Sequence, residues 1–337
     1  TTFTPFPSYY TINYIDIDAS STTSLAGLFY NVKSASYVSV RNTQNVTDFS
    51  KSLCHISDLD MSTVNLSSGE NFNYAFQYST LRNAENLSLP RATNVAYAFN
   101  NTAIIGSTLN LSIPQVTDLS YAFYYSKIKN VNLQETGNIT NLNYAFYYSS
   151  LENITGLDTS DITNLNYAFY YSKLANIADL NTSKVTNMDY AFGYTPLTSV
   201  DIYAPMLTTA KYTFRNCTSI KNFKFIAPAL TSVDSYFLYN ITAFDRVEVD
   251  LTSYTGTISN LVKGAPYMLF RNIGLLNKYG LSYSSWGANS EENRQSILDT
   301  LITYSQDRSD NPCTVTLSSF TKSQISIEEM AQINAKG

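Results

Sequence analysis

The feature that most constrains the fold of this chain is an internal repeat. A word ending in Tyr-Ala-Phe, or a weaker copy of it, recurs in one frame, and its last residue forms a column with steps of 24, 23, 23, 24, 23, 23, 23, 22 and 23 residues. The members of the column are Phe29, Leu53, Phe76, Phe99, Phe123, Phe146, Phe169, Phe192, Phe214 and Phe237. The sequence therefore predicts about ten coils, each coil being one repeat.

Other positions recur with the same period as this column. Apolar residues stand seven and four positions before the Phe, and a short alternating pattern such as Leu197, Val200 and Ile202 follows it. Alternation with period two is typical of a strand with one buried face. A unit of about 23 residues cannot bury its own apolar side, so the coils must stack and align their strands in a parallel sheet. The Asn, Asp, Ser or Thr five positions before the Phe is expected to cap a helical or irregular turn.

The repeat resembles a known family. The strands with an L-x-x-L-x-L pattern, the V-T-N-L-x-Y-A-F turns and the spacing Phe214-x-x-Cys217-x-x-Ile220 are similar to the BspA-like leucine-rich repeats of bacterial surface proteins. The resemblance covers about residues 16–260. It departs from the family pattern in its many tyrosines and in having Ser or Thr where Cys is common, at Ser79, Thr102, Ser126, Ser149, Ser172 and Thr195.

We therefore predict an α/β fold, a right-handed leucine-rich-repeat solenoid of about ten coils of 22–24 residues with a parallel sheet. The handedness follows from the rule for parallel crossovers and from the resemblance. Three domains are expected: an N-terminal cap (1–15), the solenoid (16–262) and a small C-terminal α/β capping unit (263–337).

The C-terminal unit is predicted from its local patterns. A helix should begin after Ser290, with Ile297, Leu298, Leu301 and Ile302 as its apolar stripe, and a strand should run through Cys313, Val315 and Leu317. Ser326 and Glu329 form the pattern of a capping box for a last helix, flanked by Ile325 and Met330 and ending at Gly337.

Composition excludes several functions. One His leaves no pair for a His-based zinc site, and the three Cys are widely scattered. A net charge of -5 argues against a nucleic-acid partner, and no run of apolar residues is long enough to span a membrane. No phosphate-binding, dinucleotide-binding or nucleophile motif is found, so we predict no enzyme activity, no cofactor and no metal. The cluster of Cys54, His55, Asp58 and Asp60 is interpreted as part of an ordinary coil, and Cys217 as a small buried residue.

The tyrosine columns are the most unusual feature, because 28 of 337 residues are Tyr. Residues between the Phe and the position three after it are expected to face outward. Equivalent rings of adjacent coils could stack as a purely structural ladder. A repeated Tyr/Asn surface could in addition present amphipathic rings and amide groups to a glycan or protein ligand. The predicted ligand-binding residues are Tyr124, Tyr125, Tyr147, Tyr148, Tyr170, Tyr171 and Tyr194.

A second candidate surface is the outer face of the sheet, which is interpreted mainly as a solvated face. Its residues are Lys129, Asn130, Asn132, Thr198, Ser199, Asp201, Lys221, Asn222, Lys224, Arg246 and Glu248.

The resemblance implies a non-enzymatic recognition or adhesion module at a cell or virion surface, which binds a glycan or protein on a host or neighbouring cell. The alternative is a structural component or spacer of a larger assembly, such as a phage virion or cell-surface complex, whose partners are neighbouring subunits. Tyrosine columns without defined pockets would favour this alternative, and a groove whose aromatic residues vary between coils would favour recognition.

Overall fold

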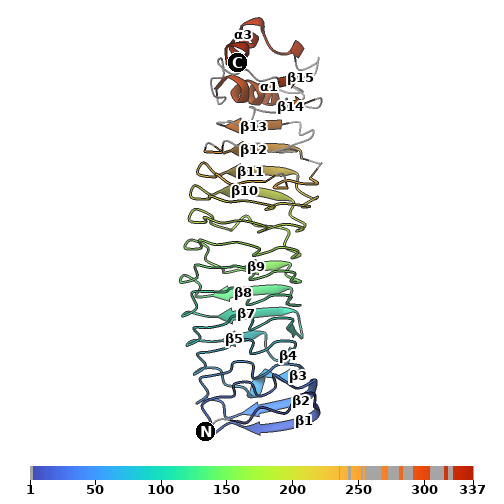
Figure 1. Cartoon of the computed structure of the whole chain (residues 1–337), viewed down its shortest axis with the longest axis vertical. Helices are drawn as coiled ribbons and strands as arrows, with labels where there is room; N and C mark the ends of the chain where they lie inside the picture. The colour runs from blue at the N-terminus through green and yellow to red at the C-terminus, as the bar shows by residue number, and fades with distance from the viewer. Residues whose placement is uncertain are drawn as a thin grey trace. The chain divides into compact units, whose positions relative to one another are not determined.

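The computed structural model of the chain describes residues 3–234, 236–241, 244–251, 253–254, 267–271, 281–283, 291–303, 315–317 and 322–336. The chain divides into two compact units, Thr1–Leu174 and Ala175–Gly337. Coils of a parallel β-solenoid fill residues 11–250 of these units, about ten in all, so the predicted solenoid is confirmed (Figure 1).

Unit 1 contains two parallel sheets. The first sheet has the order β1-β2-β3-β4-β6 and the second has the order β5-β7-β8-β9. The strands of the first sheet are β1 (Thr11–Asp18), β2 (Ser34–Arg41), β3 (Ile56–Asp60), β4 (Thr80–Arg82) and β6 (Ala103–Ile104). Those of the second are β5 (Asn86–Ser88), β7 (Thr108–Ser112), β8 (Asn130–Gln134) and β9 (Asn153–Thr155). One coil holds both β4 and β5, and the next holds both β6 and β7, so pairing passes from one sheet to the other there.

Unit 2 continues the same construction. Strands β10 (Ser199–Tyr203), β11 (Asn222–Ile226), β12 (Arg246–Asp250) and β13 (Tyr267–Arg271) pair in parallel in that order. Strand β13 thus adds to the sheet beyond residue 262, where the sequence predicts the end of the solenoid. The division of the chain into three domains remains a prediction.

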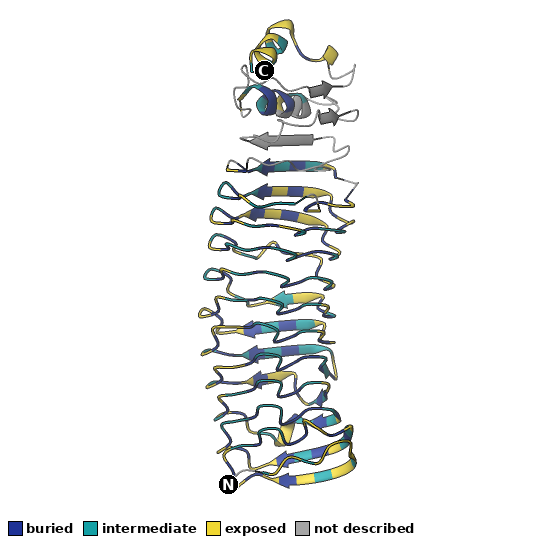
Figure 2. Cartoon of the chain, in the orientation of Figure 1, coloured by how far each residue is buried: buried dark blue, intermediate teal, exposed yellow. Residues whose placement is uncertain are grey.

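The core of the solenoid is the column of Phe residues. Every member from Phe29 to Phe237 is at most 1% exposed, and buried segments recur along the coils (Figure 2). Within unit 1 the rings from Phe76 to Phe169 stack on each other. Phe99 and Phe123 lie 5.0 Å apart, and Phe123 and Phe146 lie 4.9 Å apart, measured between ring centres. In β7, β8, β10, β11 and β12 buried residues alternate with exposed or half-buried ones, as at Val131 and Leu133 in β8. The columns read from the sequence therefore define the core.

The segment before each core Phe is not helical in any described coil. In the coils from Ser24 to Asn187, the polar residue five positions before the column residue instead accepts a hydrogen bond from the backbone N–H two residues later, for example Asn141 Oδ1 from Asn143 at 3.0 Å. Such a side chain opens a tight β-turn as readily as a helix. The same residues form isolated parallel bridges between coils, such as Asn71 with Asn94 and Asn141 with Asn164. The expected cap is therefore correct as an irregular turn and wrong as a helical one.

Hydroxyl groups take the place of the expected cysteines inside the coils. The six Ser and Thr residues are all buried, at 3% exposure or less. Ser79 Oγ donates to the Leu53 carbonyl and Thr102 Oγ1 donates to the Phe76 carbonyl, both at 2.7 Å. Because a buried carbonyl without a partner is destabilising, these hydroxyls serve to satisfy the backbone of the preceding coil.

The described helices of the chain lie in its C-terminal part. They are α1 (Glu291–Leu298), a turn of π-helix η3 (Asp299–Thr303) and α3 (Ile327–Ala335), beside the short 3-10 turn η1 (Met61–Thr63) in unit 1. Ile297, Leu298 and Leu301 are buried as predicted, whereas Ile302 is half-buried. Strand β15 (Val315–Leu317) pairs with β14 (Leu281–Tyr283).

The capping box of Ser326 and Glu329 is confirmed at the start of α3. The predicted positions Ser290, Cys313 and Gly337 lie outside the described residues. Among the described residues, no helix has the length and apolar character needed to cross a membrane.

Candidate functional site

Three parallel stacks of tyrosine rings line the β-turns of unit 1, and together we call them the tyrosine ladder. The inner stack stands two positions before the core Phe, the middle stack one position after it and the outer stack two positions after it. The inner stack consists of Tyr74, Tyr97, Tyr121, Tyr144 and Tyr167, the middle stack of Tyr124, Tyr147 and Tyr170, and the outer stack of Tyr125, Tyr148 and Tyr171.

The inner stack is the tightest. Its successive ring centres lie 4.4, 4.6, 4.9 and 4.5 Å apart and its rings are nearly parallel, with interplanar angles from 4° to 17°. This spacing is close to the 4.7–4.9 Å separation of strands in a sheet, because each ring is carried by the next coil. Face-to-face contact on both sides leaves the edges and hydroxyl groups of these rings as the parts that can face solvent.

The middle and outer stacks repeat this arrangement, and rings of neighbouring stacks also contact each other. Tyr124 stacks on Tyr147 at 5.0 Å, and Tyr148 stacks on Tyr171 at 4.3 Å. Neighbouring stacks meet edge to face, as between Tyr170 and Tyr171, with 5.0 Å between centres and 73° between planes. Stacked and edge-to-face pairs each contribute roughly 0.5–1.5 kcal/mol beyond their buried area. A ring of the middle stack such as Tyr147 is therefore held from several sides.

The backbone of the ladder is unusual, because the inner and outer stacks occupy left-handed positions. All eight residues of these two stacks have φ between 52° and 60°. A side chain with a Cβ atom costs about 1–2 kcal/mol in this conformation, which Gly and Asn adopt more readily. Asn does stand at the equivalent position in other coils, at Asn101 with φ 53° and at Asn216 with φ 58°. This strain was not foreseen from the sequence, since tyrosine is not a residue that signals a left-handed turn.

The outer stack is the most accessible part of the ladder. Tyr125 is 38% exposed and Tyr148 is 39% exposed, while Tyr171 is half-buried. The expectation that these columns face outward is therefore confirmed. Burial, followed by the neighbouring phenols, raises the pKa of Tyr147 to about 12, and burial likewise raises that of Tyr97 to about 12. The hydroxyls of these rings remain protonated at neutral pH, so they can both donate and accept hydrogen bonds.

Unit 2 carries a shorter and altered version of the ladder. Tyr190, Tyr212 and Tyr236 stack at 4.4 and 4.9 Å. Gly193 and Arg215 stand where unit 1 has the middle stack. The guanidinium carbon of Arg215 lies 5.1–5.8 Å from four ring centres, those of Tyr194, Tyr212, Tyr236 and Tyr239. A cation over aromatic faces is attracted to them, so Arg215 replaces stacking with cation–π contacts, and the predicted site residue Tyr194 is part of this cluster.

In the cluster around His55, Cys54 and His55 contact residues of the next coil. The Cys54 thiol is buried and donates to the Tyr74 carbonyl at 3.0 Å, and burial raises its pKa to about 12. His55 stacks on Tyr78 at 5.1 Å. No group of three metal-ligating side chains is found in the part of the chain that the structure describes. Cys217 is buried as predicted, with Sγ 2.9 Å from the Phe192 carbonyl.

On the outer face of the sheet, polar side chains form hydrogen bonds and ion pairs with each other. In the second sheet of unit 1, Asn132 Nδ2 donates to Asn110 Oδ1 at 3.2 Å, and Asn110 Nδ2 donates to Asn86 Oδ1 at 2.8 Å. Lys129 pairs with Glu152 at 3.0 Å. These amide and charged groups satisfy their neighbours one coil away, which is consistent with the solvated face expected from the sequence.

The structure also reveals a repeated arrangement that the sequence reasoning missed. An Asp-x-Asp pair on one strand meets an Arg-Asn pair on the next, first with Asp16, Asp18, Arg41 and Asn42, and again with Asp58, Asp60, Arg82 and Asn83. We call these the first and the second clamp. The signal was present in the sequence as D-I-D and D-L-D, each followed by R-N about one coil later.

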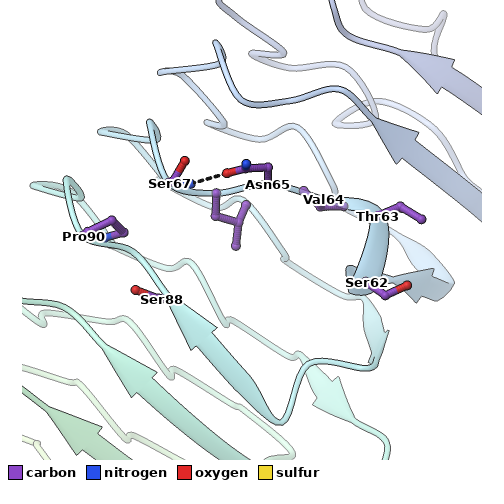
Figure 3. Close-up of a pocket in the computed structure, with 8 residues that line it drawn as sticks. Ser62, Thr63, Val64, Asn65, Ser67, Ser88 and Pro90 are labelled. Atoms are coloured by element: carbon purple, nitrogen blue, oxygen red, sulfur yellow. Dashed lines mark hydrogen bonds between the residues drawn. The ribbon is translucent and has the colours of Figure 1, made fainter.

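Described residues of unit 1 line hollows in at least two places. One, of about 430 Å³, is lined by the segment from Ser62 to Ser67 together with Ser88 and Pro90 (Figure 3). Its lining holds neither a charged nor an aromatic side chain, and Asn65 Oδ1 is occupied by the Ser67 N–H at 2.9 Å. The other, of about 210 Å³, lies on the sheet face beside the second clamp.

Comparison with known proteins identifies the repeat. A model of the BspA type leucine rich repeat region matches in six copies over residues 73–176 and 143–260. No curated protein and no solved structure gives a significant match to the chain.

Proposed function

This chain belongs to the BspA-type leucine-rich repeat family, and from that premise we propose that it is a non-enzymatic adhesion module that acts outside the cell, on a cell or virion surface. Repeats of this kind generally mediate binding. We propose further that the ladder of unit 1 is the binding surface, with Tyr125, Tyr148 and Tyr171 as its most accessible rings.

The observation that carries the proposal is the left-handed backbone of the ladder. A purely structural role is already met by Asn at Asn101 and Asn216, whose coils keep the buried Phe99 and Phe214. Asn would hold the same backbone with less strain in the other coils. Tyrosine nevertheless occupies the outer position in four consecutive coils, at Tyr125, Tyr148, Tyr171 and Tyr194. What Asn lacks is the ring, so we infer that the exposed part of the ring is used.

The geometry of the ladder favours a protein partner over a glycan. A sugar binds to tyrosine through the apolar face of the ring, and in the ladder these faces are covered by the next coil. Ring edges and hydroxyls remain, which suit the mixture of apolar contacts and hydrogen bonds in protein interfaces. The stacked rings are also ordered before binding, so little side-chain entropy is lost. Because the same contact recurs in each coil, binding would be multivalent, with each contact individually weak.

The test is the binding of the purified full chain to intact bacterial and animal cells, before and after protease treatment of their surfaces. The variant Tyr125→Asn/Tyr148→Asn/Tyr171→Asn removes the outer stack and keeps residues that tolerate the left-handed backbone. Tyr9→Asn is the matched control, because Tyr9 is also left-handed, with φ 70°, and exposed, yet lies outside the ladder.

We expect binding that is lost after protease treatment, at least tenfold weaker in the triple variant and unchanged in the control. Equal binding by the triple variant and the parent chain would reject the ladder as the contact surface.

A second candidate function is a spacer within a larger assembly. It is favoured by the regularity of the ladder, since both hollows of unit 1 described above are lined by other residues. This function predicts no cell binding by the parent chain or the variant, together with co-purification of the chain in a larger particle.

A further inference from the structure

Two tyrosines on the first sheet of unit 1 are more exposed than the rings of the ladder. Tyr14 on β1 and Tyr37 on β2 are paired in register, and Tyr37 is in turn paired with Asp58 on β3. Tyr14 is 73% exposed and Tyr37 is 60% exposed. Among the described residues, neither ring contacts another aromatic ring. Unlike the rings of the ladder, these two can receive a flat apolar surface.

The second clamp forms a polar wall beside these rings. Arg82 Nε donates to Asp58 Oδ1 at 3.0 Å, and Arg82 Nη1 donates to Asp60 Oδ2 at 2.9 Å. Within the described residues, Asp58 Oδ2 and Arg82 Nη2 make no hydrogen bond. The wall therefore offers one charged acceptor and one charged donor, both fixed in place by the ion pairs.

The first clamp shows what a purely structural version looks like. There Arg41 uses Nε, Nη1 and Nη2 on the carboxylates of Asp16 and Asp18. All three nitrogens of its guanidinium thus donate to the carboxylates of the preceding strand, and one N–H on each of Nη1 and Nη2 is left over. The second clamp differs in leaving Nη2 of its arginine available, and it is this clamp that borders the hollow of about 210 Å³.

The hollow joins the two features. Tyr14, Tyr37, Ser39, Asp58, Asp60 and Arg82 all contribute to its lining. At about 210 Å³ it lies below the roughly 300–1,000 Å³ of sites for drug-sized ligands, so it fits a single small ring rather than a long segment.

We propose that this part of the first sheet is a binding subsite for one neutral pyranose residue of a glycan. The C–H face of the sugar would lie against Tyr14 or Tyr37. One of two vicinal hydroxyls would donate to Asp58 Oδ2 and the other would accept from Arg82 Nη2. Two carboxylates against one guanidinium give the wall a negative charge, which disfavours acidic sugars. Arg82 also donates to one oxygen of each carboxylate, so these two oxygens are not available to a metal ion.

The subsite is independent of the ladder and of the proposed protein partner. The experiment uses the full chain and an array of neutral and acidic glycans, followed by saturation-transfer NMR with neutral methyl pyranosides. Tyr14→Thr/Tyr37→Thr removes both ring faces and keeps residues suited to strands. Asp58→Asn is a second variant that alters the acceptor without touching the rings. Tyr203→Thr is the matched control, because Tyr203 is also 60% exposed on a strand but lies in unit 2.

We expect neutral glycans to bind, with affinity reduced at least tenfold in the double variant and in Asp58→Asn, and unchanged in Tyr203→Thr. The variant without the outer stack should keep its sugar binding, which separates this subsite from the ladder. The proposal is overturned if no neutral glycan binds, if only acidic glycans bind, or if the double variant binds as well as the parent chain.

Discussion

Tyrosine is presented in two opposite ways within unit 1. In the ladder, rings from successive coils cover each other's faces, whereas Tyr14 and Tyr37 are exposed and, among the described residues, stack on no other ring. The separation between neighbours is that of adjacent strands or coils in both places, so spacing alone does not make a stack. The ladder differs in having rings on its flanks, such as Tyr147 against Tyr144 and Tyr148. Lateral packing fixes the rings, and without it the same residue type remains an open surface.

The largest effect on stability is expected from truncating a core ring beneath the ladder. Phe146 is fully buried and stacks on Phe123 and Phe169, so Phe146→Ala should lower the free energy of unfolding by about 3–5 kcal/mol. Since each coil contacts its neighbours, amide exchange should accelerate first around residue 146 and least in β1 and β2. Hydrogen exchange resolved along the chain measures this. A uniform acceleration through unit 1 would contradict local stacking.

The next largest effect on stability should differ between a ladder tyrosine and an exposed strand tyrosine. Tyr147→Ala removes a ring with stacked partners on both sides and edge contacts on its flanks, and we expect a loss of about 2–3 kcal/mol. Tyr37→Ala removes an exposed ring and should change stability by about 0.5 kcal/mol or less. Denaturant unfolding of the two variants gives the comparison. Similar losses would mean that Tyr37 is packed as the ladder is.

A smaller effect is expected in the outer stack. Tyr148→Asn loses stacking on Tyr125 and Tyr171 but relieves a left-handed tyrosine, with φ 52°. The two terms are of similar size and opposite sign, so the net loss should be about 1 kcal/mol or less. Tyr170→Asn is the control, because this ring is stacked while its backbone is not left-handed. If Tyr148→Asn proved the more damaging of the two, backbone strain would not be a significant term.

The ionisation of buried tyrosines has the smallest expected effect on stability at neutral pH. Burial raises the pKa of Tyr97 and Tyr147 from the ordinary 10.0 to about 12, so the unfolded chain loses these protons before the folded chain does. The unfolded state therefore binds fewer protons between these values, and the free energy of unfolding should fall as pH rises above 10.0. Below that range the ladder should be insensitive to pH. An alkaline titration followed by absorbance, alongside unfolding at each pH, tests both statements.

The repeat made most of the fold predictable from the sequence. A Phe every 23 residues or so, with apolar columns in step, leaves few arrangements other than stacked coils, and strands such as β8, β10, β11 and β12 lie at the predicted positions. The transfer of pairing from one sheet to the other was not predictable. It depends on two short strands sharing a coil, at β4 with β5 and β6 with β7, and no periodicity encodes that choice.

The candidate site was predictable only in part. The tyrosine columns and their outward direction follow from the position of the core Phe. The left-handed backbone follows from the β-turns, and it was not predicted because a helical turn was considered at these positions. The second clamp and the position of Tyr14 beside Tyr37 depend on strand register. Which residues lie opposite each other on adjacent strands can be predicted only when the exact length of each coil is known.

The ladder has a consequence for how such a chain can evolve. Each ring of the inner stack packs against the equivalent rings one coil before and one coil after, as Tyr121 does with Tyr97 and Tyr144. A duplicated or deleted gene segment that encodes one whole coil would thus join ends that already match. Recombination could lengthen or shorten the tyrosine surface in single steps, without new compensating mutations elsewhere.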